Sequence, residues 1–258
     1  MSYNEELLRK LLPKTLKNIR VWDETDSTSS EARRYALTGG TAPALFIADS
    51  QNGGRGRVGR SFYSPSGTGI YMSLLLPMAD SLADTLLMTS ASAVAVRRAI
   101  LRITGADVGI KWVNDLYLGD KKVCGILCEL LSEKKMMIVG VGINLYPSSF
   151  PEEISATAGS LLASGGDDDL RHALAAGVAE ELLAISTELS DGRFMEEYKA
   201  HSTILGRELT YTENGVSRKG TAIDVDSRGR LYVLAPDGQT NILSSGEISV
   251  RLDSYRKE

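Results

Sequence analysis

KVCGILCELL, at residues 122–131, is a run whose positions 123–131 are apolar on both faces when it is placed on a β-strand. Successive side chains of a strand point to opposite faces of its sheet, so a strand with one solvated face alternates apolar and polar residues. The run is therefore predicted to be a central strand that is covered on both sides. The charged turn at residues 133–135 and the apolar run at residues 136–145 predict an antiparallel neighbour.

Shorter apolar runs surround this hairpin and alternate with helical patterns. Strands are predicted at residues 19–22, 44–48, 70–76, 109–112 and 116–118. Helices are predicted at residues 5–16, 26–39, 82–101, 168–189 and 194–201, the first of which should stop or kink near Pro13. An antiparallel meander among several helices predicts an α+β fold in which a mixed sheet is flanked by helices.

The character of the sequence changes at Leu205. Short β-rich runs follow, at residues 208–212, 220–224, 231–234, 240–243 and 248–251, and turn residues separate them. Such spacing is typical of a small all-β barrel. A chain of 258 residues also exceeds the usual size of one domain. We therefore predict a large domain at residues 1–204 and a small β-domain at residues 205–258.

The composition narrows the function classes. The formal net charge is −4, whereas a protein that binds duplex nucleic acid usually carries a basic face. Residues 1–6 carry acids where a signal peptide has lysines, and no apolar run approaches the ~20 residues that cross a bilayer. We expect a cytoplasmic protein that binds neither DNA nor membranes.

The cysteines and histidines offer little chemistry. Cys124 and Cys128 lie four positions apart on one predicted strand, too far apart for a comfortable disulfide, and are predicted to be small buried residues. His172 and His201 fall in helical stretches with acids nearby and are predicted to be ordinary core or surface residues. The sequence contains no ligand set with the spacing of a metal cage, so no protein metal site is expected.

Residues 52–69 differ from everything around them. They contain six glycines, three arginines and one proline, a composition that disfavours regular structure and predicts a long functional loop. Gly54, Gly56 and Gly59 satisfy the pattern G-x-G-x-x-G, but a dinucleotide-binding fold needs a helix directly after this turn. Residues 60–67 will not form one, so that interpretation is rejected.

Arg55, Arg57 and Arg60 place three guanidiniums on this glycine-rich backbone. A guanidinium binds carboxylate or phosphate oxygens in a two-pronged fork, and glycines let a chain fold tightly over a ligand. The loop is therefore predicted to close around an anion. A solvated basic loop, or one that contacts RNA, is the alternative.

Two further motifs carry polar groups that suit the same ligand. The segment KWVND at residues 111–115 precedes Lys122, and a lysine beside an apolar strand is costly unless it meets an anion. Lys122 is thus a candidate phosphate or carboxylate ligand, and a polar turn at Lys121-Lys122 is the alternative. Thr28 and Glu31 fit a capping box, which is compatible with a helix N-terminus that offers hydroxyls and amides to a polar head group.

QNGGRGRVGR, at residues 51–60, resembles the biotin-binding loop of biotin–protein ligases. Five further motifs match the same family in order and spacing: DST at 26–28, KWVNDLY at 111–117, KVCGIL at 122–127, GVGIN at 140–144 and GEISVR at 246–251. The resemblance spans residues 21–251, so it is far more specific than any one motif. Val113 stands where the family usually has proline, which is expected to alter the turn without removing a functional group. Some twenty residues precede Val21, too few for the helix-turn-helix domain of the family's repressors, so a monofunctional ligase is expected.

The resemblance implies a fold and a set of site residues. The fold is a catalytic domain like that of class II aminoacyl-tRNA synthetases, followed by an SH3-like barrel. The implied biotin-binding residues are Ser27, Thr28, Ser29, Gln51, Gly54, Arg55, Gly56, Arg57, Lys122, Gly125, Gly140 and Gly142. The implied residues for ATP and the adenylate are Arg57, Arg60, Phe62, Lys111, Asn114, Asp115, Lys122 and Asn144. Arg55, Arg57 and Lys122 are the implied catalytic cations, because they would meet the biotin carboxylate and the α-phosphate of ATP.

The resemblance also implies a reaction in two steps. ATP with Mg²⁺ activates biotin as biotinyl-5'-AMP, and a lysine of a biotin carboxyl carrier protein domain then accepts the biotin. Mg²⁺ would arrive with the nucleotide, and the labile adenylate leads us to expect residues 52–66 to be mobile without ligand and ordered with it. The family allows a monomer or a homodimer. A lipoate–protein ligase of the same fold and a noncatalytic RNA- or carrier-binding module are the alternatives.

Overall fold

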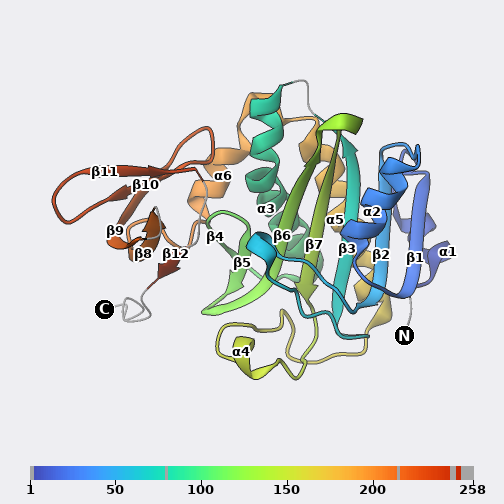
Figure 1. Ribbon diagram of the computed structural model, residues 1–258. Helices are drawn as coiled ribbons and strands as arrows, with labels where there is room; N and C mark the ends of the chain where they lie inside the picture. Colours follow the sequence, from blue (N-terminus) through green and yellow to red (C-terminus); the bar gives the residue numbers. More distant parts are fainter. Residues whose placement is uncertain (1–2, 79–80, 214–215, 245–247, 251–258) are drawn as a thin grey trace.

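Seven strands form a mixed sheet within the residues that the computed structural model describes, which are 3–78, 81–213, 216–244 and 248–250 (Figure 1). The order in the sheet is β1-β2-β3-β7-β6-β5-β4. β1 and β2 are parallel, and the later neighbours are antiparallel. The strands are β1 (Asn18–Thr25), β2 (Ala44–Gln51), β3 (Gly69–Pro77), β4 (Gly109–Lys111), β5 (Asp115–Leu118), β6 (Lys121–Leu131) and β7 (Met136–Asn144).

β6 and β7 form the predicted antiparallel hairpin, and β7 also pairs with β3. Cys124 and Ile126 are buried against the helices behind the sheet, as a central strand requires. The strand was predicted to be covered on both faces, but only the face that carries Cys124 and Ile126 is fully covered. Gly125, Leu127 and Glu129 are only partly buried, because the face that they share opens onto a cavity.

Helices cover both faces of this sheet (Figure 1). α3 and α5 pack together on one face, α1 packs against α5, and α2 packs on the other face against β2, β3 and β7. The helices are α1 (Glu5–Leu11), α2 (Thr28–Leu37), α3 (Leu82–Thr104), α4 (Glu152–Ser155), α5 (Asp168–Ser186) and α6 (Phe194–Ala200). The first helix ends before Pro13 instead of reaching residue 16, because proline restricts the residue before it to extended backbone. The short α4 was not predicted.

A second, antiparallel sheet follows, in the order β11-β10-β9-β8-β12. It contains β8 (Glu208–Glu213), β9 (Val216–Val225), β10 (Leu231–Leu234), β11 (Thr240–Leu243) and β12 (Ile248–Val250). The predicted β-rich runs therefore form strands, although β9 begins before residue 220. Of the terminal motif, Gly246, Glu247 and Arg251 lie outside the described residues. The domain boundary between residues 204 and 205 stays a prediction.

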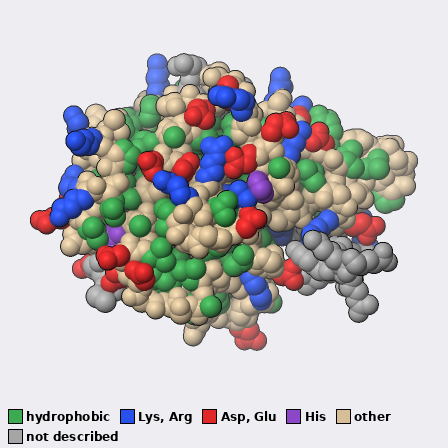
Figure 2. Space-filling model, turned by 180° about the vertical axis from the view of Figure 1, so that it is seen from behind, with side chains coloured by type: hydrophobic (Ala, Val, Ile, Leu, Met, Phe, Trp, Pro, Cys, Tyr) green, Lys and Arg blue, Asp and Glu red, His purple; other side chains and the backbone are tan. Residues whose placement is uncertain are grey.

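Within the described residues, no helix has the length and apolar composition needed to cross a bilayer. These residues also contain no group of three His, Cys, Asp or Glu side chains that could hold a metal ion. On the face seen in Figure 2, acidic and basic side chains are interspersed over the described surface.

Candidate active site

A cavity of about 420 Å³ opens at the face of the sheet where β6 and β7 carry glycines. This volume lies in the range of small-molecule sites. The predicted site residues that line it come from α2, from residues 51–62 and from β4 to β7: Ser27, Thr28, Ser29, Gln51, Arg55, Gly56, Arg57, Arg60, Phe62, Lys111, Asn114, Asp115, Lys122, Gly125, Gly140, Gly142 and Asn144. The fold thus brings together residues that are more than a hundred positions apart. Gly54 is the predicted residue that lies behind this lining.

Residues 52–68, called the arginine loop below, fold back on themselves beside the cavity. Gly56 N–H donates to the carbonyl oxygen of Arg60 at 2.7 Å, and Phe62 N–H donates to that of Gly54 at 2.9 Å. A Cβ at Gly54 would overlap the Phe62 carbonyl oxygen, and Gly59 has a φ of +74°. Both positions therefore require glycine. The loop composition predicted a loop correctly, and the glycines serve its tight turn.

The predicted cations of the loop and of β6 each meet a polar partner on the sheet. Arg57 donates from Nη1 to Asn114 Oδ1 at 3.0 Å. Lys122 Nζ lies 2.7 Å from Asp115 Oδ1. Both partners come from the segment at residues 111–115, so this segment and the loop meet at one end of the cavity. Fixed cations at this position favour an anionic ligand.

Arg55 and Lys111 have different surroundings. Arg55 forms an ion pair with Glu129, with 2.8 Å between Nη2 and Oε1. Lys111 donates from Nζ to the Tyr117 hydroxyl at 3.4 Å and lies over its ring. Burial lowers the pKa of Lys111, which Asp115 partly opposes. Lys111 thus holds its proton less firmly than an ordinary lysine, and this makes its charge sensitive to pH above neutrality.

Thr28, Ser29 and Gln51 of the cavity lining join Ser64 and Ser73 in a chain of hydroxyls and one amide, called the hydroxyl end below. Thr28 N–H donates to Gln51 Oε1 at 2.8 Å, and Gln51 Nε2 donates to Ser64 Oγ at 2.9 Å. Because Thr28 N–H can only donate, the Gln51 amide has a fixed orientation. Ser73 Oγ lies 2.8 Å from Thr28 Oγ1 and 3.0 Å from Ser29 Oγ. This end offers several donors and acceptors to a polar ring.

The predicted capping box at Thr28 does not form. Ser27 is the N-cap of α2, and Thr28 is its first residue. The Thr28 hydroxyl is directed at Gln51 and Ser73, so it cannot cap the helix. Glu31 accepts instead from the Thr25 hydroxyl at 2.9 Å. The Thr28 side chain therefore belongs to the polar lining of the cavity.

Glycines on β6 and β7 leave space above the sheet for neighbouring side chains of the site. Gly125 and Gly142 are direct neighbours across β6 and β7. A Cβ at Gly142 would collide with the Phe62 ring, and one at Gly140 would crowd Ser29 Oγ. The glycines thus let the Phe62 ring and the Ser29 hydroxyl approach the strands closely, and Phe62 forms one wall of the cavity.

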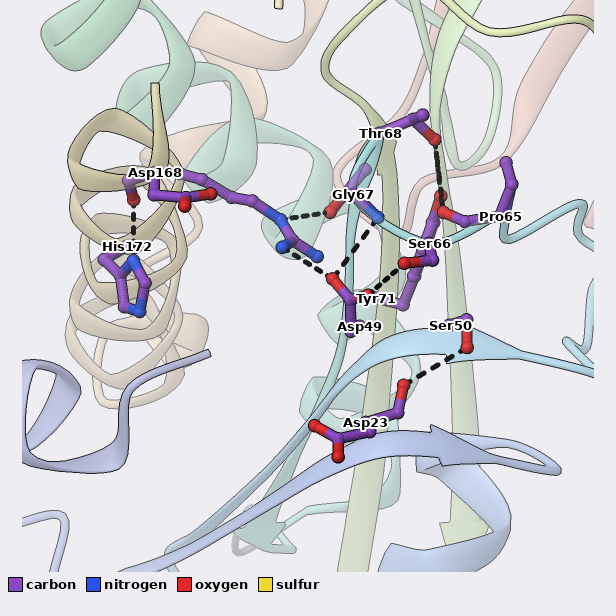
Figure 3. A network of polar contacts seen from close by, with 12 residues as sticks. Asp23, Asp49, Ser50, Pro65, Ser66, Gly67, Thr68, Tyr71, Asp168 and His172 are labelled. Carbon is purple, nitrogen blue, oxygen red and sulfur yellow. Dashed lines mark hydrogen bonds and ion pairs between the residues drawn. The ribbon is translucent and has the colours of Figure 1, made fainter. Parts of the chain in front are cut away.

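The exit of the arginine loop is tied to a buried ion pair (Figure 3). Arg171 of α5 lies 2.7 Å from Asp49 of β2, and its Nε donates to the Gly69 carbonyl oxygen at 2.9 Å. Asp49 also accepts from the Ser66 hydroxyl and, at 3.3 Å, from Gly67 N–H. Burial raises the pKa of Asp49, but the bonds from Ser66 and Arg171 outweigh it, so the pKa lies below its ordinary value. The end of the loop is thus held firmly at the point where the chain enters β3.

Histidine and cysteine residues take no part in the site. His172 accepts from Asn4 N–H at 2.8 Å through Nε2, so its Nδ1 donates to the Asp168 carbonyl oxygen at 2.6 Å. It is an ordinary core residue, as predicted. Cys124 and Cys128 are free thiols, and burial raises the pKa of Cys128 to about 11.

Several residues in or next to the cavity lining had escaped prediction. Ser73 is fully buried on β3, and a lone serine inside the apolar run IYMSLLL was a usable signal. Residues 150–158 contribute a wall that includes Phe150 and Ile154. A backbone hydrogen bond of 2.8 Å, from Lys122 N–H to the Thr157 carbonyl oxygen, holds them beside the cavity. No local sequence pattern predicts this contact.

Known proteins are similar along most of the chain. Residues 22–144 match the biotin/lipoate A/B protein ligase family, and residues 204–251 match the biotin protein ligase C-terminal domain. The bifunctional ligase/repressor BirA of Bacillus subtilis is 36% identical over 236 residues, which cover 86% of this chain and 71% of the relative. The biotin–[acetyl-CoA-carboxylase] ligase of Mycobacterium tuberculosis is 28% identical, over 90% of this chain and 88% of the relative.

Solved structures agree with these sequence matches. The biotin protein ligase from Aquifex aeolicus in complex with biotin and ATP superposes with a TM-score of 0.76 at 28% identity, and the alignment covers 92% of this chain and 99% of that one. The ligase from Leishmania major in complex with biotinyl-5-AMP gives a TM-score of 0.53 at 25% identity, over 89% and 99% of the two chains.

Proposed function

The chain belongs to the biotin protein ligase family and is a biotin–[acetyl-CoA-carboxylase] ligase, and from this premise we propose how its cavity carries out the reaction. The carboxylate of biotin attacks the α-phosphorus of ATP, which gives biotinyl-5'-AMP and releases diphosphate. The neutral amine of a lysine on a biotin carboxyl carrier protein domain then attacks the acyl carbon, forms an amide and releases AMP.

Biotin would lie along the cavity with its ureido ring at the hydroxyl end. A ureido ring has two N–H donors and one carbonyl acceptor, and Ser27, Thr28, Ser29 and Gln51 offer matching groups. The valeryl chain would pass over the glycines of β6 and β7. Its carboxylate would then lie at the cationic end, near Arg57 and Lys122.

The cations supply the chemistry of the first step. Two anions must meet before the carboxylate can attack, and charge grows on the α-phosphate oxygens in the transition state. Arg57 and Lys122 would lower this barrier by holding the anions in position and stabilising the charge. Arg60, Phe62 and Lys111 are candidates for the adenylate side, together with Asn114 and Asn144. No enzyme nucleophile is required.

Magnesium fits this site as a companion of the triphosphate. Mg²⁺ is usually bound by one or two carboxylates together with phosphate oxygens, and Asp115 is the carboxylate among the described residues that line the cavity. Asp115 would hold it. When bound, it would neutralise part of the phosphate charge.

The observation that carries the proposal is the meeting of Arg57 and Lys122 with the hydroxyl end in one cavity. Mass spectrometry of a biotin carrier domain, incubated with this protein, ATP and either biotin or lipoate, tests it. Biotin should add to one lysine and lipoate should not. Modification with lipoate alone would favour a lipoate ligase, whose family name the matching model shares, and an unmodified carrier would contradict the proposal.

A further inference from the structure

Glu129 of β6 lies between two guanidiniums from distant parts of the chain. Arg55 of the arginine loop meets it as a fork, with Nη2 2.8 Å from Oε1 and Nη1 donating to Oε2 at 3.2 Å. Arg33 of α2 donates from Nη2 to Oε1 at 3.0 Å. The Glu129 side chain is 13% exposed, and those of Arg55 and Arg33 are 41% and 39% exposed. The acid is the fixed member of this group, and Arg55 belongs to the loop.

Glu129 stands beside the cavity and not in it. Its strand positions it on the face of Gly125 and Leu127, which line the cavity, whereas Glu129 is not among the lining residues. Its carboxylate is linked to the cavity lining through Arg55, and the pair with Arg33 ties it to α2. Arg55 in turn lies between Gly54 and Gly56, where the loop turns over the cavity.

We infer that Glu129 is a positioning residue that latches the arginine loop over the cavity through Arg55, and so sets the affinity for biotin. The inference rests on the proposed function, because the ligand it concerns is the one assigned there. A guanidinium–carboxylate fork fixes orientation as well as distance, so it holds the loop backbone in one place. The bond from Arg57 to Asn114 holds the next turn of the loop, two residues on.

The latch has a measurable consequence. A ligand that needs the closed loop binds with an apparent dissociation constant that is inversely proportional to the closed fraction. Glu129→Gln keeps the shape of the side chain and removes the charge that holds the fork. The closed fraction then falls and the KM for biotin rises. Because Glu129 touches no reacting atom, kcat stays nearly constant.

Trypsin digestion of the full chain without ligands tests the latch directly. We expect Glu129→Gln to be cleaved after Arg55, Arg57 or Arg60 at least about fivefold faster than the parent, with a melting temperature within about 4 °C. Arg33→Gln leaves the fork to Arg55 intact and should be cleaved within about twofold of the parent rate. Glu180→Gln, which removes an exposed ion pair to Arg102, is the distant control and should also stay within about twofold.

Diphosphate exchange then gives the split between KM and kcat. Glu129→Gln should raise the KM for biotin about tenfold and change kcat less than about twofold, the loss expected for a charged hydrogen bond. Arg55→Lys, which keeps the charge and loses the fork, should also be cleaved at least about fivefold faster than the parent, and its digestion replaces that of Glu129→Gln if that variant does not fold. Unchanged cleavage and KM, or equal effects in Arg33→Gln, would overturn the latch. A parent protein without diphosphate exchange activity would refute the proposed function. The latch would still be tested, because digestion needs neither biotin nor ATP.

Discussion

Trp112 donates its indole N–H to the carbonyl oxygen of Gly229 at 2.9 Å. Trp112 is buried and belongs to the segment at residues 111–115 that lines the cavity. Gly229 lies in the turn between β9 and β10, where its φ of +73° suits glycine. A turn of the C-terminal sheet therefore touches the active site from behind, and we expect the small β-domain to contribute to catalysis through this contact.

Trp112→Phe should weaken catalysis without unfolding the protein. Phenylalanine keeps the aromatic ring but leaves the Gly229 carbonyl oxygen without its donor, which costs about 1–3 kcal/mol when the group stays buried. If part of this cost falls on the segment at residues 111–115, diphosphate exchange slows about tenfold. Trp22→Phe on β1, the far edge of the sheet, should exchange at the parent rate. Equal rates for both variants would show that the contact is only structural.

Lys122→Ala and Arg57→Ala should each retain the fold and reduce adenylate formation at least about 100-fold. One preorganised donor to a developing charge is commonly worth ~2.7–4 kcal/mol. Lys134→Ala removes an exposed lysine from the turn before β7 and should leave the rate unchanged. Diphosphate exchange at saturating biotin and ATP measures all three. Near-normal exchange by the first two variants would refute the roles proposed for these cations.

Local patterns predicted the sheets and helices, and failed where distant residues decide the structure. The run at residues 122–131 reveals its strand because it is apolar on both faces and a charged turn follows it. The partner of Arg55 lies 74 positions away, and the partner of Arg57 lies 57 positions away. Such pairs form only when the chain folds. The sequence therefore indicated that these arginines could bind an anionic ligand, but it did not indicate which residues hold the arginines in place. The prediction of a capping box was wrong for the same reason, because the hydroxyl of Thr28 on α2 lies within hydrogen-bond distance of Ser73 on β3.

The affinity for ATP should fall at alkaline pH because of Lys111. Burial lowers its pKa below the ordinary value for lysine, so the charge that would meet phosphate is lost as the pH rises through the lowered pKa. The free energy of unfolding should rise over the same window, since the unfolded chain then binds more protons. The KM for ATP, measured from about pH 7 to 10 at constant ionic strength, should increase in the parent and stay flat in Lys111→Arg. The same pH profile in both proteins would exclude this role.

Ser73→Ala should weaken biotin binding although Ser73 does not line the cavity. Its hydroxyl joins those of Thr28 and Ser29, and without it both lose a partner and reorient. The loss of a buried partner commonly costs about 1–3 kcal/mol, which predicts an increase of about tenfold in the KM for biotin and little change in that for ATP. Ser92→Ala on α3, another fully buried serine, controls for the removal of a hydroxyl. A parallel increase in both KM values would point to general damage of the cavity.

Arg171→Met should destabilise the protein far more than the loss of an exposed arginine. The side chains of Arg171 and Asp49 are 1% and 7% exposed, and the variant leaves the carboxylate buried without its cation. Breaking such a pair costs about 3–5 kcal/mol. Arg34→Met removes an exposed pair to Asp26 and should cost at most about 1 kcal/mol. Urea denaturation measures both, and Asp49→Asn added to Arg171→Met should recover part of the loss because no buried charge remains. If the double variant is no more stable than Arg171→Met, packing of the arginine side chain rather than its charge anchors the exit of the loop.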